Sequence, residues 1–234
     1  MTNRIELSLT ERFFFDGGHE FGSAGTYQRL IGRAHFAVEP GASAQRCITD
    51  IDKAPTDGDG LVRFTGDFSI LKPVDPALGS RRLFFDYGNR GNKRMLQFFN
   101  DVPASNNPRT LAHAGNGFLM RRGYTVAWLA WQGDLLPGNG RLLLDLPVAS
   151  NGDRPLTGLI WVEYIADRAG ITTFPLSGRA SVRSHPTLSL DPREARLTRR
   201  RYPYDERVPV PAESWCFARI EGESASTTRV SSRQ

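Results

Sequence analysis

The sequence predicts an α/β protein rich in β-structure, and two kinds of apolar pattern carry this prediction. In the first eighty residues apolar and polar side chains alternate, as they do in half-buried strands of an antiparallel sheet. In the middle, residues 83–87 and 124–131 are apolar at successive positions, as in strands buried on both faces. Strand signals return after Leu142. We therefore expect an antiparallel β region, then a mixed sheet, then further strands.

The N-terminal region contains two alternating runs, residues 27–38 and 61–71. The second run carries these apolar side chains on one face: Val62, Phe64, Phe68 and Ile70. The segment TDGDG at 56–60 favours a turn because Asp and Gly tolerate left-handed backbone angles. The two runs are therefore predicted to pair antiparallel, with His35 on the polar face of the first run in a structural role.

The middle region has the order strand, loop, helix, strand. Residues 101–110 are rich in Pro and Asn, and a helix is predicted over 111–122, ended by Gly123. A connection of this length joins parallel strands. We predict that residues 83–87 and 124–131 are adjacent, parallel strands.

The last third again favours short strands, in segments 142–147, 156–165, 195–201 and 215–220. Residues 221–234 are small and polar, which is typical of a disordered tail. The pattern divides the chain into a β-rich region at 1–78, a crossover unit at 79–140, a β-rich accessory region at 141–220 and the tail at 221–234.

Composition and short motifs exclude several classes of protein. A hydrophobic content of 39% is enough for a core. No apolar run reaches membrane-spanning length and no signal peptide is recognisable, so we expect a cytoplasmic protein with no membrane partner. Cys47 and Cys216 are far apart and lack metal-ligand spacing, which predicts two buried free thiols and no metal site. No phosphate-binding glycine motif is present, and no cofactor is predicted.

The positive charge is concentrated late in the chain. Residues 179–207 contain eight arginines and four acidic residues, within a net charge of +5. Four of these arginines are candidates for binding an anionic partner: Arg196, Arg199, Arg200 and Arg201. The alternative is the solvated outer face of a strand whose arginines pair with acids. Without a recognition helix or an aromatic RNA-binding signature, nucleic acid is not predicted as a partner.

No serine nucleophile is recognisable. The nearest approach to GxSxG is FGSAG at 21–25, where Phe21 occupies the first glycine position and a strand pattern follows instead of a helix. The four histidines have no partners in the serine, acid, histidine order. Asp50 and Asp52 are more consistent with a solvated edge than with an acid/base pair.

Six segments in order resemble the N-terminal half of a bacterial family of α/β-hydrolase domain-containing proteins. They are FGSAGTYQRLIG, ITDIDKAP, GNRGNK, NGFLMRRGYTVAWLAWQGD, EARLTRR and ESWCFAR, and the resemblance covers about residues 4–219. It implies that the middle strands belong to an incomplete α/β-hydrolase-like sheet. The family continues into a second half with a GxSxSG-like elbow, an acid and a histidine, and these are absent here. The resemblance therefore implies a truncated product.

The resemblance also implies roles for two loops. Asn89, Arg90 and Gly91 stand where such enzymes place the loop that donates a backbone N–H to the oxyanion, although a plain strand-to-helix turn is the alternative. Trp131, Gln132 and Asp134 stand where a loop lines the pocket, with a capping role as the alternative for Asp134.

These roles lead to three hypotheses of function. In the first, the chain is the N-terminal part of a serine hydrolase of ester or acyl bonds, inactive alone, and its expected partner is the missing C-terminal half or a second copy that covers exposed apolar surface. In the second, it is a non-catalytic β-rich binding module whose arginine-rich face binds an anionic partner. In the third, it is a complete enzyme with a mechanism other than serine catalysis.

Overall fold

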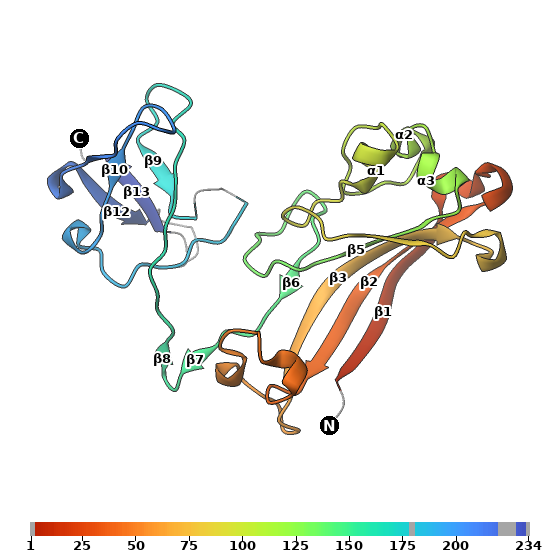
Figure 1. The fold of residues 1–234 in the computed structure, drawn as a ribbon, viewed down its shortest axis with the longest axis horizontal. Coiled ribbons are helices and arrows are strands. Elements are labelled where there is room, and N and C mark those ends of the chain that lie inside the picture. Colours follow the sequence, from red (N-terminus) through yellow and green to blue (C-terminus); the bar gives the residue numbers. More distant parts are fainter. Residues whose placement is uncertain (1–2, 178–180, 220–227, 233–234) are drawn as a thin grey trace. The chain divides into compact units, whose positions relative to one another are not determined.

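The computed structural model describes residues 3–177, 181–219 and 228–232 (Figure 1). The chain forms two compact units, Met1–Thr157 and Gly158–Gln234. Each unit has its own small set of strands and its own buried cluster, so the two are described in turn.

The first unit is built on one mixed sheet of six strands. They are β1 (Arg4–Phe14), β2 (Tyr27–Val38), β3 (Val62–Pro73), β4 (Leu83–Asp86), β5 (Thr125–Leu129) and β6 (Leu144–Asp145). The order is β1-β2-β3-β5-β4, with β6 beside β3. Strands β1, β2, β3 and β5 pair antiparallel in turn, whereas β4 pairs parallel with β5. The predicted antiparallel opening and the predicted parallel pair are both confirmed.

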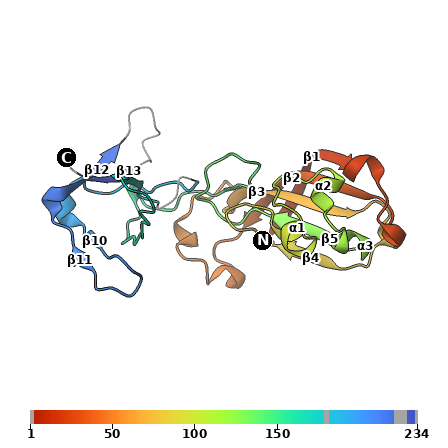
Figure 2. The ribbon, with the colours of Figure 1, turned by 90° about the horizontal axis from the view of Figure 1, so that it is seen from above.

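Three short helices lie together on one face of this sheet (Figures 1 and 2). They are α1 (Met95–Phe99), α2 (Leu111–Ala114) and α3 (Phe118–Arg121). The single helix predicted over 111–122 is wrong, because Gly115 and Gly117 adopt φ values of 55° and 66° and break it into α2 and α3. Helix α1 was not predicted from the sequence.

Single turns of 3₁₀-helix and one short hairpin complete the elements of the first unit. The turns are Phe15–Gly18, Gly22–Ala24, Ser43–Gln45, Ile51–Lys53 and Pro76–Leu78, and the hairpin joins β7 (Ser150–Asn151) to β8 (Arg154–Pro155). The turn segment TDGDG folds around Asp57, whose carboxylate accepts hydrogen bonds from the backbone of Asp59 and Leu61. It lies in the connection between β2 and β3, as expected.

The core of the first unit lies between the helices and the face of the sheet that they cover. Its members are buried apolar side chains, among them Phe15, Tyr27, Leu71, Met120 and Trp128. The Tyr27 hydroxyl donates to the backbone carbonyls of Met120 and Tyr124, and burial raises its pKa. Strand β2 is thereby fixed to α3.

The opposite face of the sheet is apolar and not covered by a helix (Figure 1). Residues paired across a sheet project to the same side, so the register places Leu9, Phe68 and Phe85 on this face. Leu9 is 54% exposed and Leu83, on the same face, is 63% exposed. The expectation that 83–87 is buried on both faces is therefore wrong, because only one side of β4 meets the helices.

The second unit contains a three-stranded antiparallel sheet in the order β12-β13-β9 and a two-stranded ladder of β10 and β11. Their bounds are β9 (Thr173–Pro175), β10 (Thr198–Arg199), β11 (Val208–Pro209), β12 (Trp215–Arg219) and β13 (Thr228–Ser232), with 3₁₀ turns at Pro192–Glu194 and Ala212–Ser214. Leu176, Trp215 and Val230 form its small core. Strand β13 comes from the tail that was expected to be disordered; residues 221–227 and 233–234 of that tail lie outside the described part.

Two other expectations differ from the structure. Segment 156–165 forms no strand, and Leu159 and Ile165 are exposed. Its apolar residues find no neighbouring strand in the described part of the chain to bond their backbone groups. Cys47 is exposed rather than buried, because it lies in a surface connection, and Cys216 is half-buried. Over the described ranges, no helix is long and apolar enough to cross a bilayer.

The uncovered face predicts binding of a hydrophobic dye. Replacing Ile5, Leu7 and Leu9 by threonine should lower the dye fluorescence of the protein, because these side chains supply exposed apolar area on β1. The free energy of unfolding should change by less than about 1 kcal/mol, since each is more than half exposed and threonine suits a strand. The control is Glu6→Thr on the other face of β1. Equal dye binding by the wild type and the triple variant would contradict the conclusion that this face of β1 is exposed.

Candidate functional site

The loop after β4 is held by one carboxylate. Asp86, the last residue of β4, accepts a hydrogen bond from the backbone N–H of Gly88 through Oδ1 (2.8 Å). Its Oδ2 accepts from the backbone N–H groups of Arg94 and Met95 and from the Trp128 indole, the last at 2.9 Å. Asp86 therefore joins the GNRG turn, the start of α1 and strand β5.

The GNRG turn itself winds through left-handed backbone conformations. Gly88, Arg90 and Gly91 have φ values of 62°, 54° and 72°. Asn89 forms a bridge with Asn92 and closes the turn. Gly91 is buried, and its carbonyl accepts a hydrogen bond from the Leu142 amide at 2.9 Å. A Cβ at Gly91 would lie 2.4 Å from the Leu142 carbonyl oxygen, so only glycine fits this contact.

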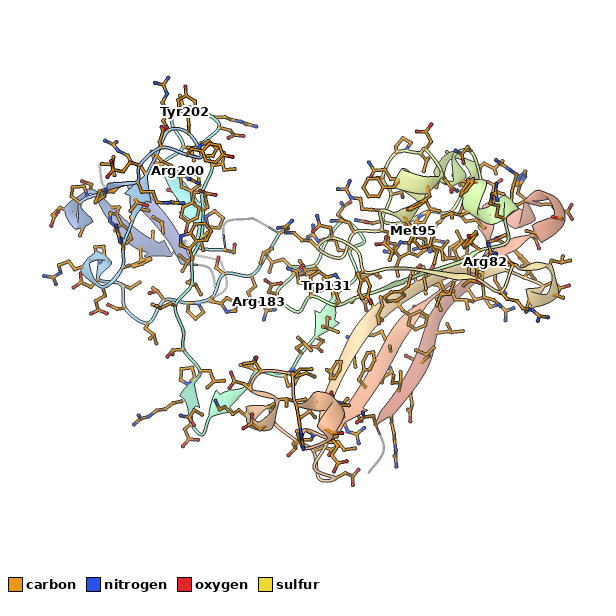
Figure 3. The ribbon with its side chains drawn as sticks, viewed as in Figure 1. Arg82, Met95, Trp131, Arg183, Arg200 and Tyr202 are labelled. Atoms are coloured by element: carbon orange, nitrogen blue, oxygen red, sulfur yellow. The ribbon has the colours of Figure 1, made fainter. Side chains whose placement is uncertain are left out.

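The two predicted loops lie together at the carboxyl ends of β4 and β5. The Trp131 indole donates to the Gly88 carbonyl at 2.7 Å and ties the WQGD loop to the GNRG turn, while its ring remains 53% exposed (Figure 3). Gln132 is half-buried beside it. Asp134 keeps one carboxylate oxygen buried without a hydrogen bond. The structure thus brings both loops to one edge of the sheet, and the donor role of the GNRG loop stays a prediction.

The candidate anion-binding arginines lie in the second unit and are only partly available (Figure 3). Arg200 is half-buried and pairs with Glu163 at 2.5 Å, which lowers the pKa of that carboxylate. Arg201 lies over the ring of Tyr202, while Arg196 and Arg199 are exposed. Arg179 lies outside the described residues. The central arginine of the cluster is therefore used within the unit.

A large cavity of the first unit was not predicted from the sequence. It measures about 780 Å³ and lies over β1, β2 and β3 beneath three loops. Its charged side chains are six basic and two acidic: Arg29, Arg33, Lys93, Arg94, Arg109, Arg141, Glu11 and Asp67. Arg29 and Arg33 stand on the polar face of the predicted strand 27–38, and nothing in the sequence indicates that loops cover this face. In the structure, segments around residues 92–94, 104–109 and 139–142 line the cavity with it.

Two cations on the wall of this cavity are buried. Arg29 is 2% exposed and Lys93 is 5% exposed. Burial, and then the charge of nearby Arg29, lowers the pKa of Lys93 to about 8. Burial, and then the charge of Arg109, lowers the pKa of Arg29 to about 10, so its guanidinium is still charged at neutral pH.

One serine hydroxyl contacts a histidine among the described residues: Ser8 Oγ lies 2.8 Å from His35 Nε2, at an exposed position where β1 pairs with β2. Ser23 is exposed in the 3₁₀ turn Gly22–Ala24 and hydrogen-bonds to none of the described histidines. The His113 ring bonds instead with Thr110 and caps α2. Within residues 3–177, 181–219 and 228–232, no group of three His, Cys, Asp or Glu side chains could hold a metal ion.

Comparisons with known proteins identify no relative. No family model, no curated protein and no solved structure matches the chain. The geometry of the first unit is therefore the basis on which function is proposed.

Removing the Asp86 carboxylate should destabilise the first unit. Asp86→Ala leaves the Trp128 indole and the amides that start α1 without their acceptor, which should cost about 3 kcal/mol. Asp75→Ala is the control, because this exposed carboxylate accepts a single backbone hydrogen bond, and should cost about 1 kcal/mol. Urea unfolding followed by tryptophan fluorescence measures both. Equal losses would contradict the central position of Asp86.

Lys93 should make stability depend on pH. Its pKa falls from 10.5 to about 8 in the folded protein, so between these values the unfolded chain binds more protons. Stability should therefore rise with pH across this window, by at most about 3 kcal/mol. Lys93→Met has no charge to bury, so its stability relative to the wild type should be highest near neutral pH and fall toward pH 10.5. If the urea midpoints of the wild type and of Lys93→Met differ by the same amount at every pH between about 8 and 10.5, the lowered pKa of Lys93 is contradicted.

Proposed function

We propose that the first unit is the oxyanion-loop part of a serine hydrolase with an α/β-hydrolase sheet, and that a segment bearing the serine elbow completes it. The observation that carries this proposal is the parallel β4/β5 pair with the Asp86-held turn at the carboxyl end of β4. In such enzymes this loop supplies one N–H to the oxyanion, and the residue after the nucleophile supplies the other.

The free edge of β4 is the place where an elbow strand fits. Both N–H donors must point at one oxygen, so the strand that ends at the serine has to lie beside β4. Strand β5 occupies one edge of β4, and no described residue pairs with the other. An added strand would also satisfy backbone groups that a sheet edge otherwise leaves open.

The uncovered apolar face supports the same proposal. Sheets with parallel crossovers are normally covered on both faces, because helices pack on each side. Here the helices cover one face, while Ile5, Leu7 and Leu83 remain more than half exposed on the other. A completing segment that carries its own helices would bury this face.

The two parts would contribute different groups to the reaction. The completing segment would supply the serine elbow, the acid and the histidine that such enzymes use. This chain would supply the GNRG turn, whose glycines let the backbone approach an acyl oxygen, and the adjoining Trp131 loop. The reaction class is hydrolysis of esters or related acyl bonds.

The proposal predicts that the chain alone is inactive. Without the serine elbow and its acid and histidine, it should neither hydrolyse p-nitrophenyl esters above a heat-treated control nor react with a fluorophosphonate. Addition of a separate chain that carries a strand, a GxSxG elbow, an acid and a histidine should produce ester hydrolysis. Fluorophosphonate labelling of this chain by itself would contradict the proposal, and labelling lost in Ser23→Ala would locate the missed nucleophile.

Gly91 should be necessary for that complementation. Gly91→Val places a side chain against the Leu142 carbonyl and distorts the turn, so turnover should fall at least about tenfold while the elbow chain still binds. Gly41→Val is the matched control, because a Cβ there has no neighbour within 4 Å, and it should keep full activity. Full activity of the Gly91 variant would show that the GNRG turn is not part of the active site.

A stable homodimer that does not bind the elbow chain would also contradict the proposal. In that case a second copy of this chain, and not the elbow segment, covers the uncovered face.

A further inference from the structure

The cavity over β1, β2 and β3 carries an excess of positive charge, from six basic against two acidic side chains. Arg29 projects from β2, and Lys93 comes from the segment just after the GNRG turn. Both are at least nine-tenths buried, and the charge of Arg29 adds to burial in lowering the pKa of Lys93. Two buried like charges on the wall of one cavity are costly, and a bound anion would offset that cost.

The hydrogen-bond partners of these cations are all neutral. Arg29 donates through Nε to the Ser69 hydroxyl (3.0 Å) and through Nη1 to the Asn107 side chain and the Pro108 carbonyl (2.7 and 2.9 Å). Its Nη2 donates to none of the described residues. Lys93 donates one hydrogen bond, to the Gly140 carbonyl at 2.9 Å, although an ammonium has three donors. Donors therefore remain for a ligand.

The two acids of the cavity each pair with another arginine. Glu11 pairs with Arg109 at 2.7 Å, at an exposed position. Asp67 accepts the Leu143 amide at 2.9 Å, and its other oxygen lies 3.6 Å from Arg33 Nε. The charges of Glu11 and Asp67 still favour the charged forms of Arg29 and Lys93, but neither acid hydrogen-bonds to these two cations.

We propose that this cavity binds a small anionic molecule through its carboxylate or phosphate oxygens, with Arg29 and Lys93 as the charged contacts. A guanidinium and an ammonium are the side chains that bind such oxygens most strongly. The volume of about 780 Å³ suits a small organic molecule rather than a lone ion. Ile31 and Leu142 line the remainder of the cavity and can contact an apolar part of the ligand. This site does not depend on the proposed hydrolase role, since binding needs no elbow segment.

Titration calorimetry of the full chain at low ionic strength tests the proposal with two probes, sulfate for phosphate esters and citrate for carboxylates. At least one should bind saturably, with a dissociation constant of about 1 mM or tighter. Binding of citrate alone assigns carboxylates, and binding of sulfate alone assigns phosphate esters. Neither probe changes its charge above about pH 7, so binding should weaken several-fold as pH rises past the Lys93 pKa of about 8.

Variants distinguish anion binding in the cavity from anion binding to charged side chains elsewhere on the surface. Lys93→Met should weaken binding at least about tenfold and remove the pH dependence, without loss of stability near neutral pH. Arg29→Lys keeps the charge but loses the planar set of donors, and should also weaken binding. Arg46→Met removes one exposed arginine away from the cavity and should bind like the wild type. Absence of binding to both probes, or wild-type binding by both cavity variants, overturns the proposal.

Discussion

The Asp86 carboxylate is the contact on which the arrangement of the first unit depends. It stands at the end of β4 and accepts hydrogen bonds from the GNRG turn, from the start of α1 and from Trp128 of β5. Helix α1 has only five residues and would not be stable on its own, so this contact and the core beneath it hold the helix in place. The position of the loops above the sheet follows from this one side chain.

The sheet that this contact organises is closed on one side and open on the other. Helices and the buried core cover one face. On the opposite face Phe68 of the central β3 is buried, whereas Leu9 and Leu83 on the outer strands are exposed, and no described residue pairs with the outer edge of β4. Apolar side chains on an open face and unpaired backbone groups on an open edge favour association with a further strand and helices. The hydrolase proposal and the proposed anion site use different parts of this sheet. An experiment that contradicts one of them therefore leaves the other unchanged.

The sequence predicted the strands whose pattern is local and missed the features that depend on distant contacts. Alternation along 27–38 and 61–71 predicted β2 and β3, two of the three long strands, and two apolar runs at crossover spacing predicted the parallel pair. Helix α1 was missed because its N-terminus is capped by Asp86 from another element. The cavity was missed because Arg29 and Lys93 are far apart in sequence and meet only after loops cover β2. Segment 156–165 has strand composition, but no strand of the described part of the chain pairs with it.

Amide hydrogen exchange of β4 tests the central claim most directly, because it reports whether the outer edge of this strand is open. In the isolated chain, the β4 amides that do not bond to β5 should exchange rapidly, while those of β5 between two neighbours should be protected. Addition of the chain that carries the serine elbow should protect the outer β4 amides together with the gain of ester hydrolysis. Uniform protection of β4 in the isolated chain, or ester hydrolysis that appears without any change at β4, would contradict the account.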